Sequence, residues 1–377
     1  MKPSICLCMI VKNESKVIER CLASVRDLID TWVISDTGST DGTQDLIRAA
    51  LDGLPGELYE EPWVDFGHNR TLNVRHARGR ADYLLLLDAD LVLRQDTPLP
   101  PLTADSYMLR HEGNLEYRIK RLVRGDLPWR YEGATHEYLT LDAPAADVQE
   151  NQQNLDALVV EDFADGGSRH DKFERDARLL RAALDRDPGN TRTVFYLAQT
   201  LRDLGETDEA ITLYQRRAAM GGWAEEVYYS LLQVGMLQAE TGGPDAWPTA
   251  MDTLIRAWEH RPERLEACYE LVSRLRLQKR HHTAYALARA GVDGPRPDDL
   301  LFVQPWVYRW GLLFEFSITA YWAGDAAASL TACDRLLSLP DLPASYRRQT
   351  LANREFAERR VTATTGLVSS SAPSRGR

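Results

Sequence analysis

The sequence predicts two parts of different fold class: an N-terminal α/β part built on a mostly parallel, Rossmann-like sheet, and an all-α part that follows it. In the first part, short apolar runs at Ile5–Val11, 32–35 and 83–87 alternate with helix-like stretches, an order typical of a parallel sheet. From about residue 171 glycines become fewer and apolar residues recur every three or four positions, which is the period of a helix.

Two carboxylates follow the strand predicted at 83–87. Asp88, Ala89 and Asp90 come where this continuously apolar run ends, and ligands of open α/β sheets bind outside the carboxyl ends of such strands. Carboxylate oxygens bind Mg²⁺ or Mn²⁺, ions that also take phosphate oxygens. An isolated Asp-x-Asp is more often a solvated loop turn, so this prediction depends on the neighbouring motifs.

The two earlier strands also open into polar segments. Residues 12–14 (KNE) follow Ile5–Val11, and residues 36–43 (DTGSTDGT) follow 32–35. Glycine and aspartate in the second segment indicate a sharp turn before a helix that begins near residue 43.

Together these motifs resemble the nucleotide-sugar-binding signature of family 2 glycosyltransferases with the GT-A fold. VKNE at 11–14, SDTGSTDGT at 35–43 and LLLDADLVL at 85–93 occur in the order of the family, and the resemblance covers roughly residues 1–140. It implies metal-dependent sugar transfer from a nucleotide-sugar donor, most often a UDP-sugar. Many members carry two consecutive acids at the second motif, whereas here Asp36 stands alone.

The resemblance implies roles for the residues of the first three motifs. Asp90 would bind Mg²⁺ or Mn²⁺, while Asp88 and Ala89 would lie nearer the ribose or a metal-bound water. Asp36 would accept a hydrogen bond from the base. The alternative for Asp36 is a side chain that stabilises the turn, as Asp commonly does before Gly. The backbone of Ile10 would line the same edge of the nucleotide, together with Lys12.

Arg70 lies in a fourth segment, residues 62–71, which precedes an amphipathic helix. It matches the position of an arginine that commonly reaches the nucleotide in family 2 enzymes, and a guanidinium offers a fixed fork of donors to carbonyl or phosphate oxygens. The alternative is that Asn69 caps the helix and Arg70 is a solvated first-turn residue. A positive charge there opposes the helix dipole.

His136 and Glu137 follow an aromatic and glycine segment at 129–134. Displacing the nucleotide with inversion takes one step and needs a base for the acceptor's proton, which the resemblance assigns to Glu137. His136 would complete the metal shell or touch the diphosphate, since neutral imidazole is a ready ligand. These two roles could be exchanged. A lone histidine is more often simply packed or exposed.

The all-α part resembles tetratricopeptide repeats, which are helix pairs of about 34 residues. One unit begins at Pro188, a second at Pro262, and a weaker third covers 310–336. Stacked units form a concave surface that we expect either to bind a peptide or protein acceptor or to pair two copies of the chain. The aromatic residues at 306–322 could serve such a surface, although aromatics at helical spacing more often form a core.

We predict a catalytic domain at 1–165, a helical repeat domain at 171–360 and a disordered tail at 361–377, with residues 165–168 as the hinge. The net charge of −11 argues against nucleic acid or an anionic membrane as a partner. The apolar run near the N-terminus is too short to span a bilayer and does not resemble a signal peptide. Five cysteines without pairing or metal spacing predict reduced thiols in a cytoplasmic protein.

The combination of parts resembles bacterial peptide glycosyltransferases, which place a sugar on Ser or Cys of a peptide. We therefore predict a metal-dependent, inverting glycosyltransferase (a hexosyltransferase) that acts on Ser, Thr or Cys of a peptide or protein. One alternative is an acceptor that is a cell-envelope saccharide or lipid-linked. A second is a repeat-based binding module with a vestigial transferase domain, which predicts loss of the metal-binding carboxylates; Asp88, Asp90 and Glu137 are present.

Overall fold

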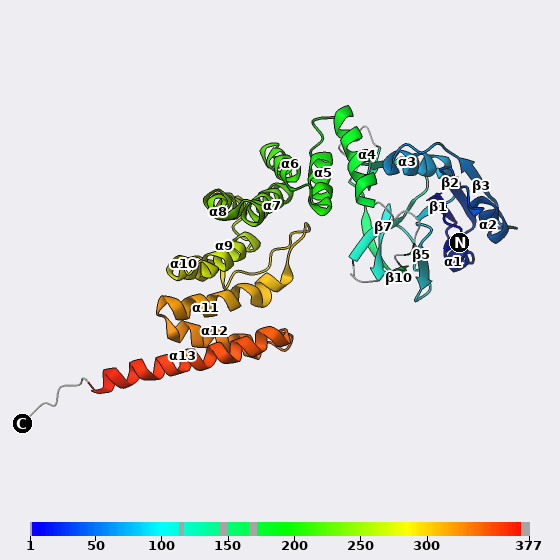
Figure 1. The fold of residues 1–377 in the computed structure, drawn as a ribbon. Coiled ribbons are helices and arrows are strands. Elements are labelled where there is room, and N and C mark those ends of the chain that lie inside the picture. The colour runs from blue at the N-terminus through cyan, green and yellow to red at the C-terminus, as the bar shows by residue number, and fades with distance from the viewer. Residues whose placement is uncertain (1, 113–116, 143–148, 164, 166–171, 371–377) are drawn as a thin grey trace, which may run out of the picture. The chain divides into compact units, whose positions relative to one another are not determined.

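The structure is a computed structural model that describes residues 2–112, 117–142, 149–163, 165 and 172–370. The chain forms two compact units, Met1–Thr200 and Leu201–Arg377. The first contains the sheets and the second is entirely helical in its regular structure (Figure 1). The predicted fold class, a mostly parallel α/β part followed by a helical part, is confirmed.

The main sheet has eight strands in the order β3-β2-β1-β4-β7-β6-β10-β5. Strand β1 pairs in parallel with β2 and β4, and β2 with β3, whereas β7 runs antiparallel to both of its neighbours. The strands are β1 (Ile5–Val11), β2 (Thr31–Asp36), β3 (Gly56–Glu60), β4 (Tyr83–Leu86), β5 (Leu91–Gln95), β6 (Ser106–Glu112), β7 (Tyr117–Arg124) and β10 (Gln152–Asp162).

Helices cover both faces of the parallel part of this sheet, which explains its continuously apolar strands. Side chains of α1 (Ile18–Val25) and α2 (Thr43–Ala50) join one core with Leu7 and Met9 of β1. Side chains of α3 (Phe66–Ala77) join the opposite core with Cys6 and Cys8 of the same strand. Successive residues of β1 are therefore buried on alternate sides.

The strand order creates a switch point between β1 and β4. The chain runs outward from β1 to β2 and β3, then returns to the other side of β1 as β4. The connections leave β1 and β4 in opposite directions, and such a crevice at the carboxyl ends of parallel strands is where ligands of open α/β sheets bind.

A hairpin of β8 (Trp129–Glu132) and β9 (Tyr138–Leu141) forms a second, small sheet. Its loop is fastened to the start of α3, where the backbone N–H of Phe66 donates to the carbonyl of Ala134 at 3.2 Å. A Cβ on Gly67 would lie only 2.2 Å from the carbonyl oxygen of Gly133. Glycine at 67 is therefore what allows this close approach of helix and loop.

The remaining helices follow in sequence. Helix α4 (Lys172–Arg186) and the beginning of α5 (Thr191–Leu204) belong to the first unit, although the predicted repeat domain begins at 171. The second unit contains α6 (Thr207–Ala219), α7 (Ala224–Thr241), α8 (Gly243–His260), α9 (Glu266–Leu277), α10 (His281–Gly291), a π-helix η2 (Val307–Gly311), α11 (Leu312–Ala323), α12 (Ala326–Ser338) and α13 (Ala344–Ser370).

In the second unit each helix packs on the next, from α6 to α13 (Figure 1). The predicted second and third repeat units correspond to α9 with α10 and α11 with α12. The pair α7 and α8 is an additional unit, which Pro248 inside α8 obscures in the sequence. Helix α13 extends through Ser370 and so includes part of the predicted tail; residues 371–377, and most of the predicted hinge, lie outside the described residues.

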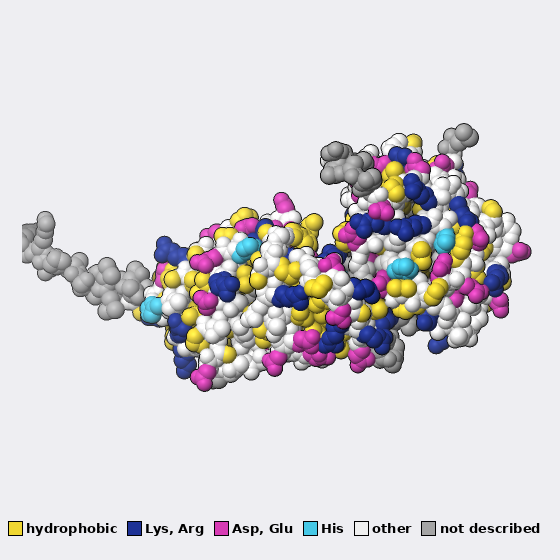
Figure 2. Space-filling model, turned by 90° about the horizontal axis from the view of Figure 1, so that it is seen from above, with side chains coloured by type: hydrophobic (Ala, Val, Ile, Leu, Met, Phe, Trp, Pro, Cys, Tyr) yellow, Lys and Arg dark blue, Asp and Glu magenta, His cyan; other side chains and the backbone are white. Residues whose placement is uncertain are grey.

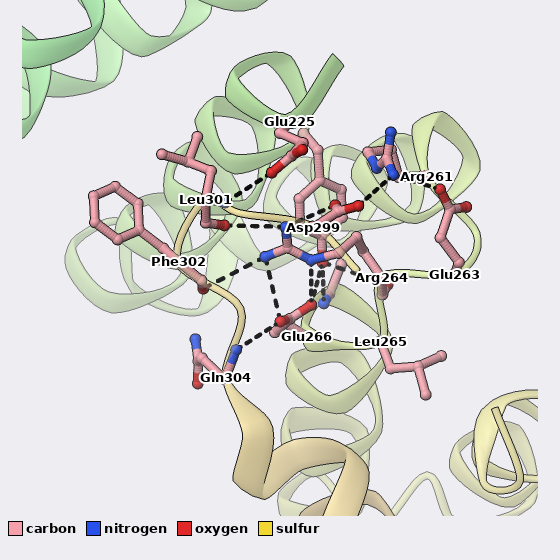
Figure 3. Close-up of polar contacts among 12 residues, drawn as sticks. Glu225, Arg261, Glu263, Arg264, Leu265, Glu266, Asp299, Leu301, Phe302 and Gln304 are labelled. Carbon is pink, nitrogen blue, oxygen red and sulfur yellow. Dashed lines mark hydrogen bonds and ion pairs between the residues drawn. The ribbon is translucent and has the colours of Figure 1, made fainter. Parts of the chain in front are cut away.

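A buried ion network fixes the connector between α10 and η2 (Figure 3). Arg264 is fully buried and donates to Glu266 at 3.0 Å, to Asp299 at 3.1 Å and to the carbonyl of Leu301 at 3.1 Å. Glu225 accepts from the backbone N–H of Leu301 at 2.7 Å. Side chains thus satisfy the backbone groups that this irregular segment leaves without a helical partner.

Most of the predicted aromatic group is core. Trp306, Tyr308, Trp310, Phe314 and Phe316 pack within two apolar clusters of the second unit. Tyr321 and Trp322 instead border a small cavity between α11 and α13, and Trp322 is 59% exposed.

Acidic and basic side chains are interspersed over the face of the molecule drawn in Figure 2. Across the described residues, every helix is too short or too polar to cross a membrane.

Candidate active site

A cavity of about 430 Å³ lies at the switch point, where β1 and β4 end. Nearly all of the sequence-predicted site residues line it together, namely Ile10, Lys12, Arg70, Asp88, Ala89, Asp90, His136 and Glu137. The exception is Asp36, which does not line the wall, although its neighbour Thr37 does. The cavity is lined by residues of the first compact unit only.

Asp88 is held by two arginines. One carboxylate oxygen pairs with Arg70 and the other with Arg121 at 3.2 Å. Burial opposes the charge of Asp88, but these two guanidinium groups outweigh it and lower the pKa of the carboxyl well below its usual value. Asp88 is therefore an ionised, fixed group at the end of β4.

Arg70 also pairs with Glu137, whose Oε1 lies 2.8 Å from Arg70 Nε. Both side chains are largely buried, at 14% and 16% exposure. The alternative in which Arg70 is solvated and Asn69 caps α3 is wrong. Asp65 is the cap and accepts from the backbone N–H of His68 at 2.8 Å, while Asn69 is fully buried.

Asp36 stabilises the turn after β2 and keeps one oxygen unused. Its Oδ1 accepts from the backbone N–H groups of Gly38 at 2.9 Å and Ser39 at 2.8 Å. Asp36 is only 1% exposed, and among the described residues its Oδ2 has no hydrogen-bond partner. The turn role is therefore real, and it leaves a buried carboxylate oxygen beside the cavity wall.

The first two motifs are fastened to each other. Asn13, which has a positive φ of 56°, donates its backbone N–H to Ser39 Oγ at 2.8 Å and accepts from the N–H of Thr40 at 2.8 Å. Asn tolerates this left-handed conformation better than most residues. The loop after β1 therefore takes its position from the loop after β2.

His136 is an exposed residue on the hairpin loop and has a φ of 50°. Its ring stacks on Tyr196 of α5 at 4.3 Å, and its carbonyl accepts from Arg192 at 2.9 Å. Helix α5 thus supports the loop that carries Glu137.

The cavity also contains residues that sequence reasoning missed. Arg121 of β7 donates to His111 of β6 at 3.3 Å, and burial together with Arg121 lowers the pKa of His111 to about 4. No local pattern marks Arg121, because the pairing of β7 with β6 is irregular at this residue: Leu122 pairs with Tyr107 and Lys120 with Met108. Lys172 and Arg175 of α4 line the cavity too, and neither carries a recognisable motif.

The carboxylate of Asp90 fits a hard divalent ion that protein side chains hold only in part. Among the described residues there is no group of three His, Cys, Asp or Glu side chains placed to hold a metal. Mg²⁺ commonly uses one or two carboxylates and completes its shell with water and substrate phosphates. Asp90 on the cavity wall supplies one such carboxylate, whereas Arg70 and Arg121 hold the oxygens of Asp88.

Comparison with known protein families matches residues 6–104 to Glycosyl transferase family 2. Residues 6–104 are a family 2 glycosyltransferase domain. The family 2 match spans the strands that form the switch point and includes Asp36, Arg70, Asp88 and Asp90.

Two curated relatives extend beyond the family 2 domain. A TPR repeat-containing protein of Synechococcus elongatus is 29% identical over 259 residues, which cover 64% of this chain and 63% of that protein. The SPbeta prophage-derived glycosyltransferase SunS of Bacillus subtilis is 23% identical over 236 residues, covering 55% and 52%. The chain therefore spans between half and two thirds of the length of these relatives.

Among solved structures, the chain is similar to YrrB, described as a TPR protein with an unusual peptide-binding site, at 15% identity and a TM-score of 0.37, covering 50% of this chain and 86% of that one. It is also similar to TTC0263, a TPR protein of Thermus thermophilus, at 15% identity and a TM-score of 0.34, covering 48% and 90%.

Proposed function

We propose that this chain is an inverting glycosyltransferase that moves a sugar from a nucleotide-sugar donor, preferably a UDP-sugar, to a Ser, Thr or Cys side chain of a peptide or protein. One observation carries the proposal. The residues that follow β1 and β4 share a single cavity with Arg70, His136 and Glu137, which come from other elements. The family 2 match supports the donor class.

The nucleotide would lie along the carboxyl ends of β1 and β2. The unused Oδ2 of Asp36 suits an N–H of the base, because a buried carboxylate oxygen without a partner is costly. Ile10 and Lys12 would line the same edge. Lys172 and Arg175 bring positive charge to the wall of the cavity, which suits a diphosphate.

Asp90 would hold Mg²⁺ or Mn²⁺, with His136 as a further ligand or a contact to the diphosphate. When bound, the ion neutralises the negative charge that develops on the departing nucleoside diphosphate. Asp88 would act differently, because its two arginine partners already occupy its oxygens. It would position Arg70 and Arg121 next to the sugar nucleotide.

Glu137 would be the general base. The acceptor oxygen or sulfur forms a bond to the anomeric carbon while the bond from that carbon to the diphosphate breaks, and the acceptor's proton passes to the Glu137 carboxylate. Attack opposite the leaving group inverts the anomeric centre in one step. Arg70 would orient the carboxylate through its contact at 2.8 Å.

A peptide acceptor is supported by the helical second unit, because stacked helical repeats present a concave surface that can hold a peptide. The similarity to the glycosyltransferase SunS over more than the family 2 domain supports sugar transfer. The vestigial-domain alternative is disfavoured because the acidic residues meet in one cavity rather than being scattered.

The test is release of nucleoside diphosphate by the purified protein from UDP-, GDP- and TDP-sugars, with Mn²⁺, with Mg²⁺ and with EDTA. We expect release from one donor class, dependent on the ion and increased by an acceptor peptide. Protein that neither binds nor cleaves any of these donors would refute the proposal. Transfer only to a saccharide or lipid-linked acceptor would keep the reaction and replace the acceptor.

A further inference from the structure

A second cavity, of about 380 Å³, borders the same hairpin loop as the donor cavity. Its walls are formed by the loop around Thr135, by Tyr138, by the turn between α4 and α5 at 187–190, and by α5 as far as Tyr196. All of these belong to the first compact unit. Thr135 lines both cavities, so the loop that carries Glu137 is the partition between them.

Two polar atoms at this cavity have no hydrogen-bond partner among the described residues. One is Oγ1 of Thr135, a residue only 4% exposed. The other is the buried Nε of Arg192. Leaving buried polar atoms unpaired costs free energy. The cavity therefore favours an occupant that offers hydrogen-bond acceptors and donors at close spacing.

The aromatic residues of this cavity are already engaged. The guanidinium of Arg192 lies 4.7 Å from the ring centroid of Tyr138 and 4.7 Å from that of Tyr196. A sugar ring stacking on these faces would have to displace the cation. A peptide main chain would not, and it presents one N–H and one C=O at each residue.

We propose that the second cavity binds the acceptor as a peptide, through the main chain next to the Ser, Thr or Cys that receives the sugar. This inference rests on the proposed function and names its acceptor subsite. The position of this subsite also couples peptide binding to Glu137, the proposed base. Arg192 donates to the carbonyl of His136 at 2.9 Å, and Tyr196 stacks on the His136 ring. A peptide that contacts Arg192 therefore affects the position of His136, the residue adjacent to Glu137.

The first test fills the cavity from a position that tolerates a side chain. A Cβ on Gly189 would meet only the Asp187 carboxylate at 3.5 Å, an ordinary contact. We expect Gly189→Trp to lower kcat/KM for peptide transfer by about tenfold or more, equivalent to about 1.4 kcal/mol, while Gly189→Ala stays close to the wild type. Donor cleavage without peptide should be the same in both variants.

The second test does not depend on whether a variant with a large new side chain folds correctly. The native cysteines are all buried, so a Thr191→Cys variant provides one accessible thiol at the cavity wall. A mixed pool of short peptides with a central Ser should slow maleimide labelling of this thiol, and the nucleotide sugar alone should not. Labelled protein should lose peptide transfer relative to the same unlabelled variant, and keep donor cleavage.

Each of these experiments has a result that would overturn the proposed peptide subsite. Peptide transfer that is unchanged by Gly189→Trp or by labelling at position 191 overturns the subsite. Protection by oligosaccharides but not by peptides overturns the peptide assignment and names a sugar acceptor. A peptide pool that neither protects the thiol nor is glycosylated also overturns it. A wild-type protein that cleaves no donor is a separate outcome, because it refutes the proposed function and not only the peptide subsite.

Discussion

Arg70 and Glu137 are joined by an ion pair in which Nε and Oε1 are 2.8 Å apart, and the same guanidinium pairs with Asp88. One side chain on α3 therefore connects the end of β4 with the hairpin loop. Burial opposes the charge on Arg70, but Asp88 and Glu137 raise its pKa above its usual value. Arg70 therefore stays charged in this buried position.

Glu137→Gln tests the assignment of the base. The variant should bind the donor as the wild type does and lose transfer by about 100-fold or more, since a positioned base contributes about 10²–10⁴. Donor titration and transfer kinetics measure the two effects separately. Glu61→Gln is a matched control, because this carboxylate pairs with His76 at 2.9 Å away from the cavity wall.

Equal loss of donor binding and transfer in Glu137→Gln would instead place Glu137 among the donor or metal contacts. If the acceptor is a Cys thiol, the loss should be smaller and should recover in alkaline buffer, because a thiol loses its proton far more easily than a hydroxyl.

Gly67→Ala tests whether the contact between α3 and the hairpin loop is tight. Helix propensity alone predicts that Ala is better than Gly by about 1 kcal/mol. The clash with the carbonyl of Gly133 at 2.2 Å should reverse the sign and lower the free energy of unfolding by about 1–3 kcal/mol. Urea unfolding measures this. Gly189→Ala, which meets no such clash, is the control, and equal stability of both variants would contradict the close approach.

Arg264→Met tests the buried network of the second unit. The change leaves the carboxylates of Glu266 and Asp299 without their buried partner, and breaking such a pair costs about 3–5 kcal/mol. Arg274→Met is the matched change at a partly exposed arginine, which pairs with Glu270 on the same helix, and should cost about 1 kcal/mol or less. Denaturant midpoints of the two variants should differ clearly; similar midpoints would mean that the network adds little.

His111 predicts a pH dependence of stability. Its folded pKa of about 4 lies below the ordinary value of about 6.5, so the unfolded chain binds a proton that the folded chain does not. Stability should therefore fall as the pH drops from about 6.5 to about 4, by up to about 1.4 kcal/mol per pH unit. Arg121 favours the neutral ring, whereas Asp88 and Asp162 oppose it.

His111→Gln should reduce that slope in urea unfolding across this pH range, because glutamine still accepts a hydrogen bond from Arg121 but does not titrate. The same change at the exposed His68 is the control. A slope that is the same in His111→Gln and in the wild type would show that other groups cause the pH dependence.

The cavity residues that the sequence pattern alone predicts lie at the carboxyl ends of strands. The run at 83–87 is continuously apolar because helices cover both faces of the sheet, and Asp88 and Asp90 follow at its carboxyl end. Local pattern was enough there, because parallel strands bring their carboxyl ends to one edge.

The cavity residues that the sequence does not predict are brought there by the tertiary arrangement of the strands and helices, which short sequence patterns do not reveal. His111 and Arg121 come from β6 and β7, and only the strand order places β7 beside β4. Lys172 and Arg175 lie on a helix that we expected to belong to the repeat domain, because its period matches the helices that follow. The position of this helix on the cavity wall depends on tertiary contacts with α3, such as the ion pair of Arg186 with Asp65 at 3.4 Å and the guanidinium of Arg175 at 5.1 Å from the ring centroid of Phe66.

The central claim is that the cavity binds a nucleotide sugar with a divalent ion, and a thermal-shift panel tests it most directly. UDP-, GDP- and TDP-sugars are compared with and without Mn²⁺, because a ligand that binds only the native state raises the unfolding midpoint by mass action. We predict a metal-dependent rise with one nucleotide class in the wild type. In Asp90→Asn that rise should be lost, while the variant still unfolds in one cooperative transition in the absence of ligand. No shift with any donor, or an equal shift in Asp90→Asn, would contradict the account.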